Sequence, residues 1–434
     1  MAIPNDSFPV TREALLHALY EAAELEQNLM CTYLYAAFSL KAGEAEGLSA
    51  CEAEAVARWR RAILGVAIDE MSHLVAVWNL TSALGGAPRF GRTNFPLDAG
   101  YLPANIVVKL APFGEEVIQH FIYLERPDPS GEPDGEGFAA PEMGVRTPSA
   151  LRLTPTGFDY ATIGDFYQQV ESDLRAMVTE LGEESVFCGD PALQLTAAEN
   201  RLKGATAVTD LDSALAALNE IVVEGEGAPD NRENSHFARF LALRSELHQL
   251  KAANPNFAPA HPAAVNPVLR KPPHPGGKVW LENAEAIATV DAANAIYALS
   301  LRLLAGAYAV PRPDPRKATY VACAVGLMHA IGAMGERAAR LPAGPSHPEC
   351  NAGMSFTAPR EAASLPQEHA ALEIYAERLD QLLAAIEAMD PADPACIRTS
   401  QILQGQAERL RALRLAGADP VRTTVNEGVA CRFP

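Results

Sequence analysis

Apolar residues recur at spacings of three and four along residues 11–40. The stripe consists of Leu15, Leu19, Ala22, Leu29, Met30, Tyr33 and Ala37. This period is typical of an amphipathic helix that packs one face against a core. Thr11 can cap the start of the helix, and Gly43 ends the pattern. The spacing therefore predicts a long first helix.

A second apolar pattern opens with the capping box Ser49-Ala-Cys-Glu52 and runs to Leu84, before two glycines. At about 1.5 Å per residue, this helix is roughly 50 Å long. A short glycine-containing loop separates it from the first helix. The two helices are therefore expected to form an antiparallel hairpin.

Residues 87–161 have a different character, with many prolines and glycines, a short β-like run over 105–110 and a short helix over 114–125. A third helix begins at Thr162, and a fourth begins near Asp210. Two helices, a long crossover and two more helices predict a mainly α protein. The arrangement is that of a ferritin-like four-helix bundle with one long connection between helices 2 and 3.

Composition changes again after the bundle, and three units are predicted. Residues 1–250 form the bundle with its crossover insertion, about 87–161. The proline-rich stretch 251–279 reads as an extended surface linker. Residues 280–434 form a helical C-terminal domain, with patterns near 282–310, 315–340, 365–389 and 394–415.

Acidic side chains occur on or beside the apolar stripes of the four bundle helices. Glu26 lies on the stripe of the first helix, and Glu70 and His73 lie on that of the second. Glu171 flanks the stripe of the third. Glu226 extends the fourth by one step of four, provided that this helix continues through Gly225. Each helix would then project one carboxylate toward a common interior.

Buried carboxylates that stay ionised cost several kcal/mol each unless they are compensated. Protonation, pairing with Arg or Lys, and a metal ion are the three remedies, and no Arg or Lys shares these stripes. Four carboxylates balance two divalent cations, and Glu70 and His73, three apart, face the same way. The pattern predicts a dinuclear metal site. A solvated glutamate or a hydrogen-bonded core histidine remains the alternative for each residue taken alone.

Four segments resemble the ferritin-like iminophenyl-pyruvate dimer synthase family. They are ELEQNLMCTYLYAAFSL (24–40), VAIDEMSHLVAVWNLTSALGGAP (66–88), TIGDFYQQVE (162–171), and EGEG (224–227) followed by SHFARF (235–240). The resemblance covers about residues 10–245 and implies a bundle with a dinuclear iron site. The implied ligands are Glu26, Glu70, His73, Glu171, Glu226 and His236.

The second half of this ligand set departs from the usual di-iron pattern. Glu226 and His236 are ten residues apart instead of forming an ExxH repeat. His236 must therefore come from a new helix start, and Glu224 is the reserve ligand if Glu226 cannot reach. Tyr33, one turn after Met30, is a candidate hydrogen-bond donor behind the ligands.

These residues predict an oxidoreductase that uses O₂ or a peroxide on a small organic substrate. The cofactor would be two iron ions, with manganese and zinc left open. The resemblance implies an amino-acid-derived imine as one substrate. A non-catalytic iron-binding or storage protein is the alternative, and a bundle that has lost its site is a third reading. No P-loop, GxGxxG after a strand or GxSxG occurs.

The charge balance narrows the range of partners. With 35 basic and 54 acidic residues, the net charge of −19 disfavours nucleic acids and anionic membranes. Seven scattered cysteines without CxxC, and no signal-like N-terminus, favour the cytoplasm. The C-terminal half is expected to cover the bundle, complete the substrate pocket or form a homodimer interface.

Overall fold

The computed structural model describes residues 10–97, 102, 106–127, 130–138, 160–203, 205–225, 234–274, 276–358, 364–365 and 367–417. Its helices are α1 (Arg12–Ser39), α2 (Ala50–Ala83), α3 (Glu115–Leu124), α4 (Ile163–Leu181), α5 (Glu183–Val186), α6 (Ala197–Asn200), α7 (Leu211–Glu224), α8 (His236–Ala253), α9 (Ala284–Tyr308), α10 (Pro315–Arg340), α11 (Glu368–Glu387) and α12 (Pro394–Gly417). Two short ladders accompany them. Strand β1 (Pro267–Val268) runs parallel to β2 (Val279–Trp280), and β3 (Pro342–Gly344) runs antiparallel to β4 (His347–Asn351). The predicted mainly α class is confirmed.

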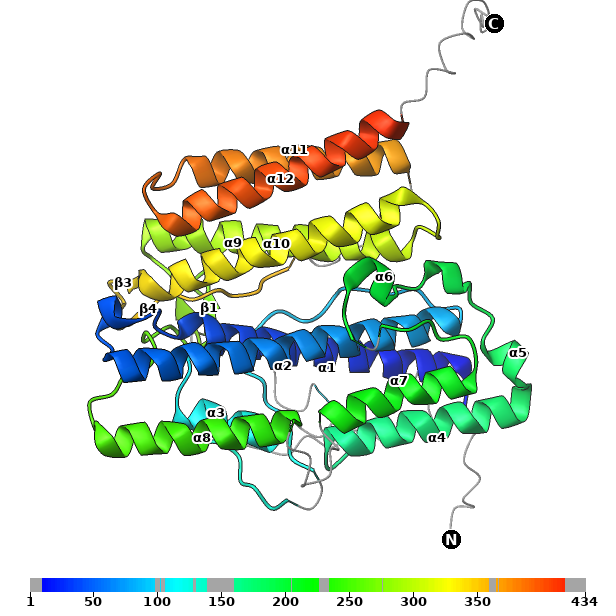
Figure 1. Ribbon diagram of the computed structural model, residues 1–434, viewed down its shortest axis with the longest axis horizontal. Coiled ribbons are helices and arrows are strands. Elements are labelled where there is room, and N and C mark those ends of the chain that lie inside the picture. The colour runs from blue at the N-terminus through cyan, green and yellow to red at the C-terminus, as the bar shows by residue number, and fades with distance from the viewer. Residues whose placement is uncertain are drawn as a thin grey trace, which may run out of the picture.

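The long hairpin of α1 and α2 forms the central layer of the molecule (Figure 1). Thr11 caps α1 by accepting a hydrogen bond from the Ala14 amide at 3.1 Å. Ser49 and Glu52 form the expected capping box at the start of α2. The buried face of each helix therefore begins where the sequence pattern places it.

Two helix pairs, α3 with α8 and α4 with α7, lie end to end along one face of this hairpin (Figure 1). Thr162 and Asp210 cap α4 and α7 as expected. Two details of the sequence interpretation were wrong. Helix α7 ends at Glu224, with Gly225 as its C-cap, instead of continuing. The described part of the β-like run, residues 106–110, is not a strand.

The opposite face of the hairpin supports α9 and α10, and α11 and α12 form the outermost layer (Figure 1). Helix α10 meets α1 where the Phe38 ring lies against Gly335, a position with no room for a Cβ. One buried apolar cluster extends from Leu15 to Leu410. It includes side chains from both predicted domains.

The proline-rich segment is partly built into this core. Phe257, Ala263 and Asn266 are buried. Ala260 forms an isolated bridge to Leu40, the residue after α1, and Ala263 forms one to the last residue of β4. The segment therefore joins two layers, where a surface linker was expected.

A buried lysine closes the end of α9. The Lys317 Nζ donates to the carbonyls of Leu193, Ala307 and Val310 at 2.8, 2.8 and 3.2 Å. Burial lowers the pKa of this amine to about 8. Lys317 satisfies carbonyls that a helix terminus otherwise leaves without donors.

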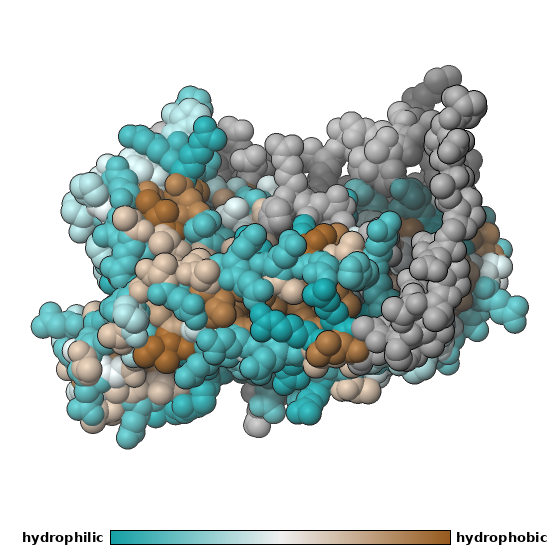
Figure 2. Space-filling model, turned by 90° about the horizontal axis from the view of Figure 1, so that it is seen from above, coloured by the Kyte–Doolittle hydropathy of each residue, from teal (hydrophilic) through white to brown (hydrophobic). Residues whose placement is uncertain are grey.

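Helices α2, α9 and α10 are long and apolar enough, by length and composition, to cross a membrane, and more than half of each apolar window is buried inside the protein. Seen from the side of α11 and α12, hydrophobic residues lie in separate patches among hydrophilic ones (Figure 2). Ile374, Ile397 and Leu415 are exposed on these two helices.

Candidate metal centre

Glu26 of α1 meets Glu70 and His73 of α2 inside the bundle. All three side chains are buried. The His73 Nδ1 lies 3.1 Å from Glu70 Oε2 and 3.6 Å from Glu26 Oε2. Glu70 and His73 face the same way because they are three residues apart on one helix. Their oxygen and nitrogen atoms form a group that could hold one metal ion.

A second group shares Glu70 and adds residues from the junction of the two helix pairs. His236 is the first residue of α8, and Glu125 directly follows α3. The His236 Nδ1 is 3.3 Å from Glu70 Oε1 and 3.3 Å from Glu125 Oε2. Both new side chains are buried. Glu70 therefore directs one oxygen at each group, and the two groups can hold a pair of ions.

Of the other two predicted ligands, Glu171 lies away from the cluster, and Glu226 cannot be placed. Glu171 is half-exposed and accepts two hydrogen bonds from Arg175, at 2.9 and 2.8 Å, so the structure does not bring it to the cluster. Helix α4 instead buries Tyr167, Val170 and Leu174. Glu226 lies outside the described residues. The reserve candidate Glu224 does reach the site.

Glu224 ends α7 at the open side of the cluster. Its Oε2 lies 3.7 Å from the His73 Nε2, and its side chain is 28% exposed. Among the described residues, two partly solvated carboxylates lie beside the buried histidines. Glu224 is one, and Asp69, whose Oδ2 lies 3.4 Å from His236 Nε2, is the other. Glu224 therefore marks where solvent approaches the site.

Two tyrosines hold the buried carboxylates. Tyr33 donates its hydroxyl hydrogen to Glu125, and Tyr167 donates to Glu26. Both phenols are buried. Tyr33, which was predicted as a donor behind the ligands, thus contacts a carboxylate outside the predicted ligand set. Donors of this kind fix the orientation of a carboxylate ligand.

The sequence interpretation missed Glu125 and Tyr167. Glu125 lies in the crossover, outside the four helices that were searched for carboxylates. Its signal was a single acid that ends the apolar run VIQHFIYLE (117–125). Tyr167 lies on the apolar stripe of α4, where a tyrosine is ordinarily a core residue.

Glu26 and Glu70 have pKa values that are shifted in opposite directions. Burial and the charge of Glu70 raise the pKa of Glu26 to about 8. Burial acts in the same direction on Glu70, but hydrogen bonds and charges from His236 and His73 outweigh it and lower the pKa of Glu70. Without metal, Glu26 therefore holds a proton at neutral pH and Glu70 does not.

The pKa values of both histidines are raised in the metal-free protein, which favours the protonated imidazole. Burial lowers the pKa of His73, but Glu224 and Glu26 outweigh it and raise that pKa well above its ordinary value. Burial also lowers the pKa of His236, but the charge of Glu125 acts in the opposite direction. The pKa of His236 is therefore raised well above its ordinary value. Protons thus provide the positive charge that the buried carboxylates require.

Two metal ions would satisfy the buried oxygen and nitrogen atoms of this cluster better than protons do. Four atoms of the two ligand groups are buried and have no hydrogen-bond partner among the described residues: Glu26 Oε2, Glu70 Oε1, His73 Nε2 and His236 Nε2. An unsatisfied buried polar atom costs about 1–3 kcal/mol. Carboxylate oxygens and imidazole nitrogens are ordinary ligands of iron, manganese and zinc. The residues of both groups therefore fit two such ions.

The ferritin-like family model matches residues 19–245, more than half of the chain. The chain belongs to the ferritin-like family. The matched range contains every residue of both metal-ligand groups. The family resemblance that the sequence motifs indicated is confirmed.

Two curated relatives of this ferritin-like chain are known. The 2-imino-3-(indol-3-yl)propanoate dimerase of Chromobacterium violaceum is 29% identical over 348 residues, which cover 73% of this chain and 31% of the relative. Dichlorochromopyrrolate synthase of Lentzea aerocolonigenes is 26% identical over 313 residues, covering 62% and 28%. The chain thus spans less than a third of either relative.

A solved structure is also similar to this ferritin-like chain. It is a ferritin-like protein from Caulobacter vibrioides with 18% identity and a TM-score of 0.48. The match covers 81% of this chain and all of the other.

Proposed function

We propose that this ferritin-like chain is a dinuclear-metal oxidoreductase that acts on a small organic substrate. The observation that supports it is the position of Glu70, whose two oxygens face two different groups of buried ligands. Stability alone gives no reason to bury three carboxylates and two imidazoles together, since apolar residues of similar volume are often as stabilising. Retention of such a cluster favours a functional site.

Each group would hold one ion. Glu26, Glu70 and His73 bind the first, and Glu70, Glu125 and His236 bind the second, with iron or manganese as the metals that suit this donor set. When bound, the ions supply electron transfer between the organic substrate and its oxidant.

The chain's own residues prepare the site in three ways. Burial of Glu26, Glu125 and His236 keeps bulk water out of its inner side. Tyr33 and Tyr167 hold two of the carboxylates in place. The protons on Glu26 and on the two imidazoles leave when metal binds, because a ligand atom must be deprotonated.

The names of the two relatives support a proposal for the substrate class. One is named for dimerisation of an indolyl imino acid, and the other for synthesis of a chromopyrrolate. We infer that this chain couples two molecules of an amino-acid-derived imine. One carbon–carbon bond forms, two carbon–hydrogen bonds break, and two electrons and two protons leave. A peroxide takes them up to give two molecules of water, or O₂ takes them up to give hydrogen peroxide.

Elemental analysis and a coupling assay test this proposal together. Protein purified without chelator should hold two iron or manganese ions per chain. Aromatic imino acids generated in situ by an amino-acid oxidase should give dimer detectable by mass spectrometry, with oxidant consumed only when substrate is present. Loading far above two ions per chain, with no dimer, would favour the storage alternative instead.

A further inference from the structure

The α1–α2 hairpin has a second recess on the face that supports α9 and α10. This cavity has a volume of about 510 Å³, within the range of about 300–1,000 Å³ usual for small-molecule sites. Residues of α1, α2, α9 and α10 line it, and none of the metal-ligand residues does. The cavity is therefore separate from the metal centre.

Apolar side chains dominate the wall. They include Phe38, Met71, Trp78, Phe90, Leu301 and Leu304. The charged lining residues are Glu336, which pairs with Arg60 at 2.7 Å, and the exposed Arg398. No buried cation among the lining residues compensates a ligand carboxylate. The cavity therefore suits an uncharged molecule, in contrast to an imino acid.

Two hydrogen-bond donors of the lining residues lack acceptors among the described residues. The indole Nε1 of Trp78 is buried and unpartnered, although its ring contacts Tyr20 and Phe90. The side-chain Nδ2 of Asn200 is also unpartnered. Tryptophan Nε1 ordinarily finds an acceptor when it is buried. Both nitrogens lack accessible surface, however, so a ligand in the cavity does not reach either of them.

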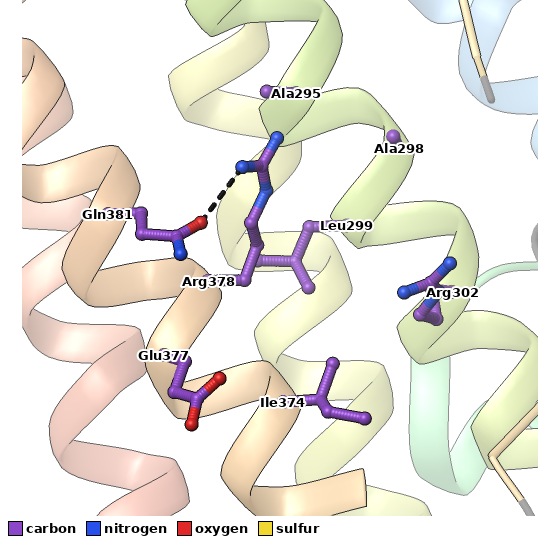
Figure 3. A pocket seen from close by; sticks show the side chains of 8 residues that line it. All are labelled: Ala295, Ala298, Leu299, Arg302, Ile374, Glu377, Arg378 and Gln381. Atoms are coloured by element: carbon purple, nitrogen blue, oxygen red, sulfur yellow. Dashed lines mark hydrogen bonds between the residues drawn. The ribbon is translucent and has the colours of Figure 1, made fainter.

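Exposed apolar side chains also lie at the rim of the cavity, beside the exposed His329 and Arg398. Ile68 of α2 and Val325 of α10 line it and are 49% and 38% exposed. A different pocket, between α9 and α11, shows the contrast (Figure 3). Its 350 Å³ are lined partly by Arg302, Glu377 and Arg378, and Arg378 donates to Gln381 at 3.1 Å. That pocket has several charged groups at its wall, whereas apolar side chains dominate the wall of the larger cavity.

We propose that the cavity between the α1–α2 and α9–α10 layers binds an uncharged, apolar organic molecule. The ligand buries its body against the apolar wall, where no buried cation is available to a charged group. Binding needs neither the metal ions nor the coupling reaction, so this site stands or falls separately from the proposed function.

Gly332 of α10 provides a way to block the cavity. It lines the wall, and a Cβ added there meets only Phe38, at an ordinary 3.8 Å. Gly332→Phe therefore places a ring in the cavity without a backbone clash, and Gly332→Ala is the matched control.

The probe is Nile red, a neutral aromatic dye with a carbonyl acceptor, titrated against the full chain and followed by its fluorescence. We expect saturable one-to-one binding that weakens at least tenfold in Gly332→Phe and less than twofold in Gly332→Ala. Diphenylhexatriene, an apolar dye without a hydrogen-bond acceptor, should show the same order of affinities among the three proteins.

Three results would overturn the proposal: dye binding that does not saturate, equal binding by Gly332→Phe and Gly332→Ala, or a dye signal that grows only as the protein self-associates in light scattering. Circular dichroism and metal content establish that each variant is folded with its metal centre intact. Loss of dye binding with metal content retained supports the cavity site whatever the fate of the coupling assay.

Discussion

Replacing Glu125 with glutamine removes a buried charge that joins the crossover to the metal centre. The side chain is fully buried, accepts a hydrogen bond from Tyr33, and lies 3.3 Å from His236 Nδ1. Glutamine keeps the volume and an acceptor for Tyr33, so the loss is confined to the charge. A hydrogen bond to a charged group is worth about 1.5–3 kcal/mol, and we expect the metal-free protein to lose about this much stability.

The larger effect of Glu125→Gln falls on metal binding. The second group retains only Glu70 and His236, so metal content should drop from two ions per chain to one. A free ion at about 1,000 times its Kd stabilises a protein by roughly 4 kcal/mol, and the variant forfeits that stabilisation for the second ion. Elemental analysis gives the stoichiometry, and urea unfolding with and without metal gives the stabilisation.

Glu171→Gln is the matched control for this experiment. Glu171 also flanks the apolar stripe of its helix, but it is half-exposed and paired with Arg175. The control should keep both ions and lose at most about 0.5 kcal/mol, as a surface pair does. Two tightly held ions in Glu125→Gln, or a lost ion in Glu171→Gln, would refute the assignment of the second group.

Other perturbations test the surroundings of the centre. Tyr167→Phe removes the hydrogen bond to Glu26 and should weaken metal affinity about 10–100-fold in competition with a chelator, with the fold unchanged; an unchanged affinity would contradict its positioning role. The pKa values of Glu26 and His73 are raised on folding, the former to about 8, so the folded metal-free protein binds more protons than the unfolded chain between pH 6 and pH 8. Its stability in urea with chelator should therefore fall as pH rises across that range, and a rise would contradict the linkage. Lys317→Met leaves three buried carbonyls without their donor and should cost about 3 kcal/mol of unfolding free energy while metal content stays at two; a loss below 1 kcal/mol would show that water replaces the amine.

Local pattern was sufficient to predict the helices and the first half of the site. Helices α1 and α2 begin at their predicted caps, because capping and hydrophobic period are properties of neighbouring residues. Glu70 and His73 are three residues apart on one helix, and this spacing places both side chains on the same face. Glu26 could be added because it lies on the buried stripe of the adjacent helix.

The second half of the site depends on contacts between segments far apart in the chain. Glu125 and His236 are separated by 111 residues and meet because α3 and α8 pack against each other. A helical period cannot distinguish a flank that faces the core from one that meets solvent, so Glu171 looked equivalent to Glu26 but turned outward to Arg175. The sequence alone determined which helices carry acidic groups on or beside apolar faces. Only the packing of those helices decided which acids meet, because the distance between two side chains is set by how the surfaces of their helices fit together.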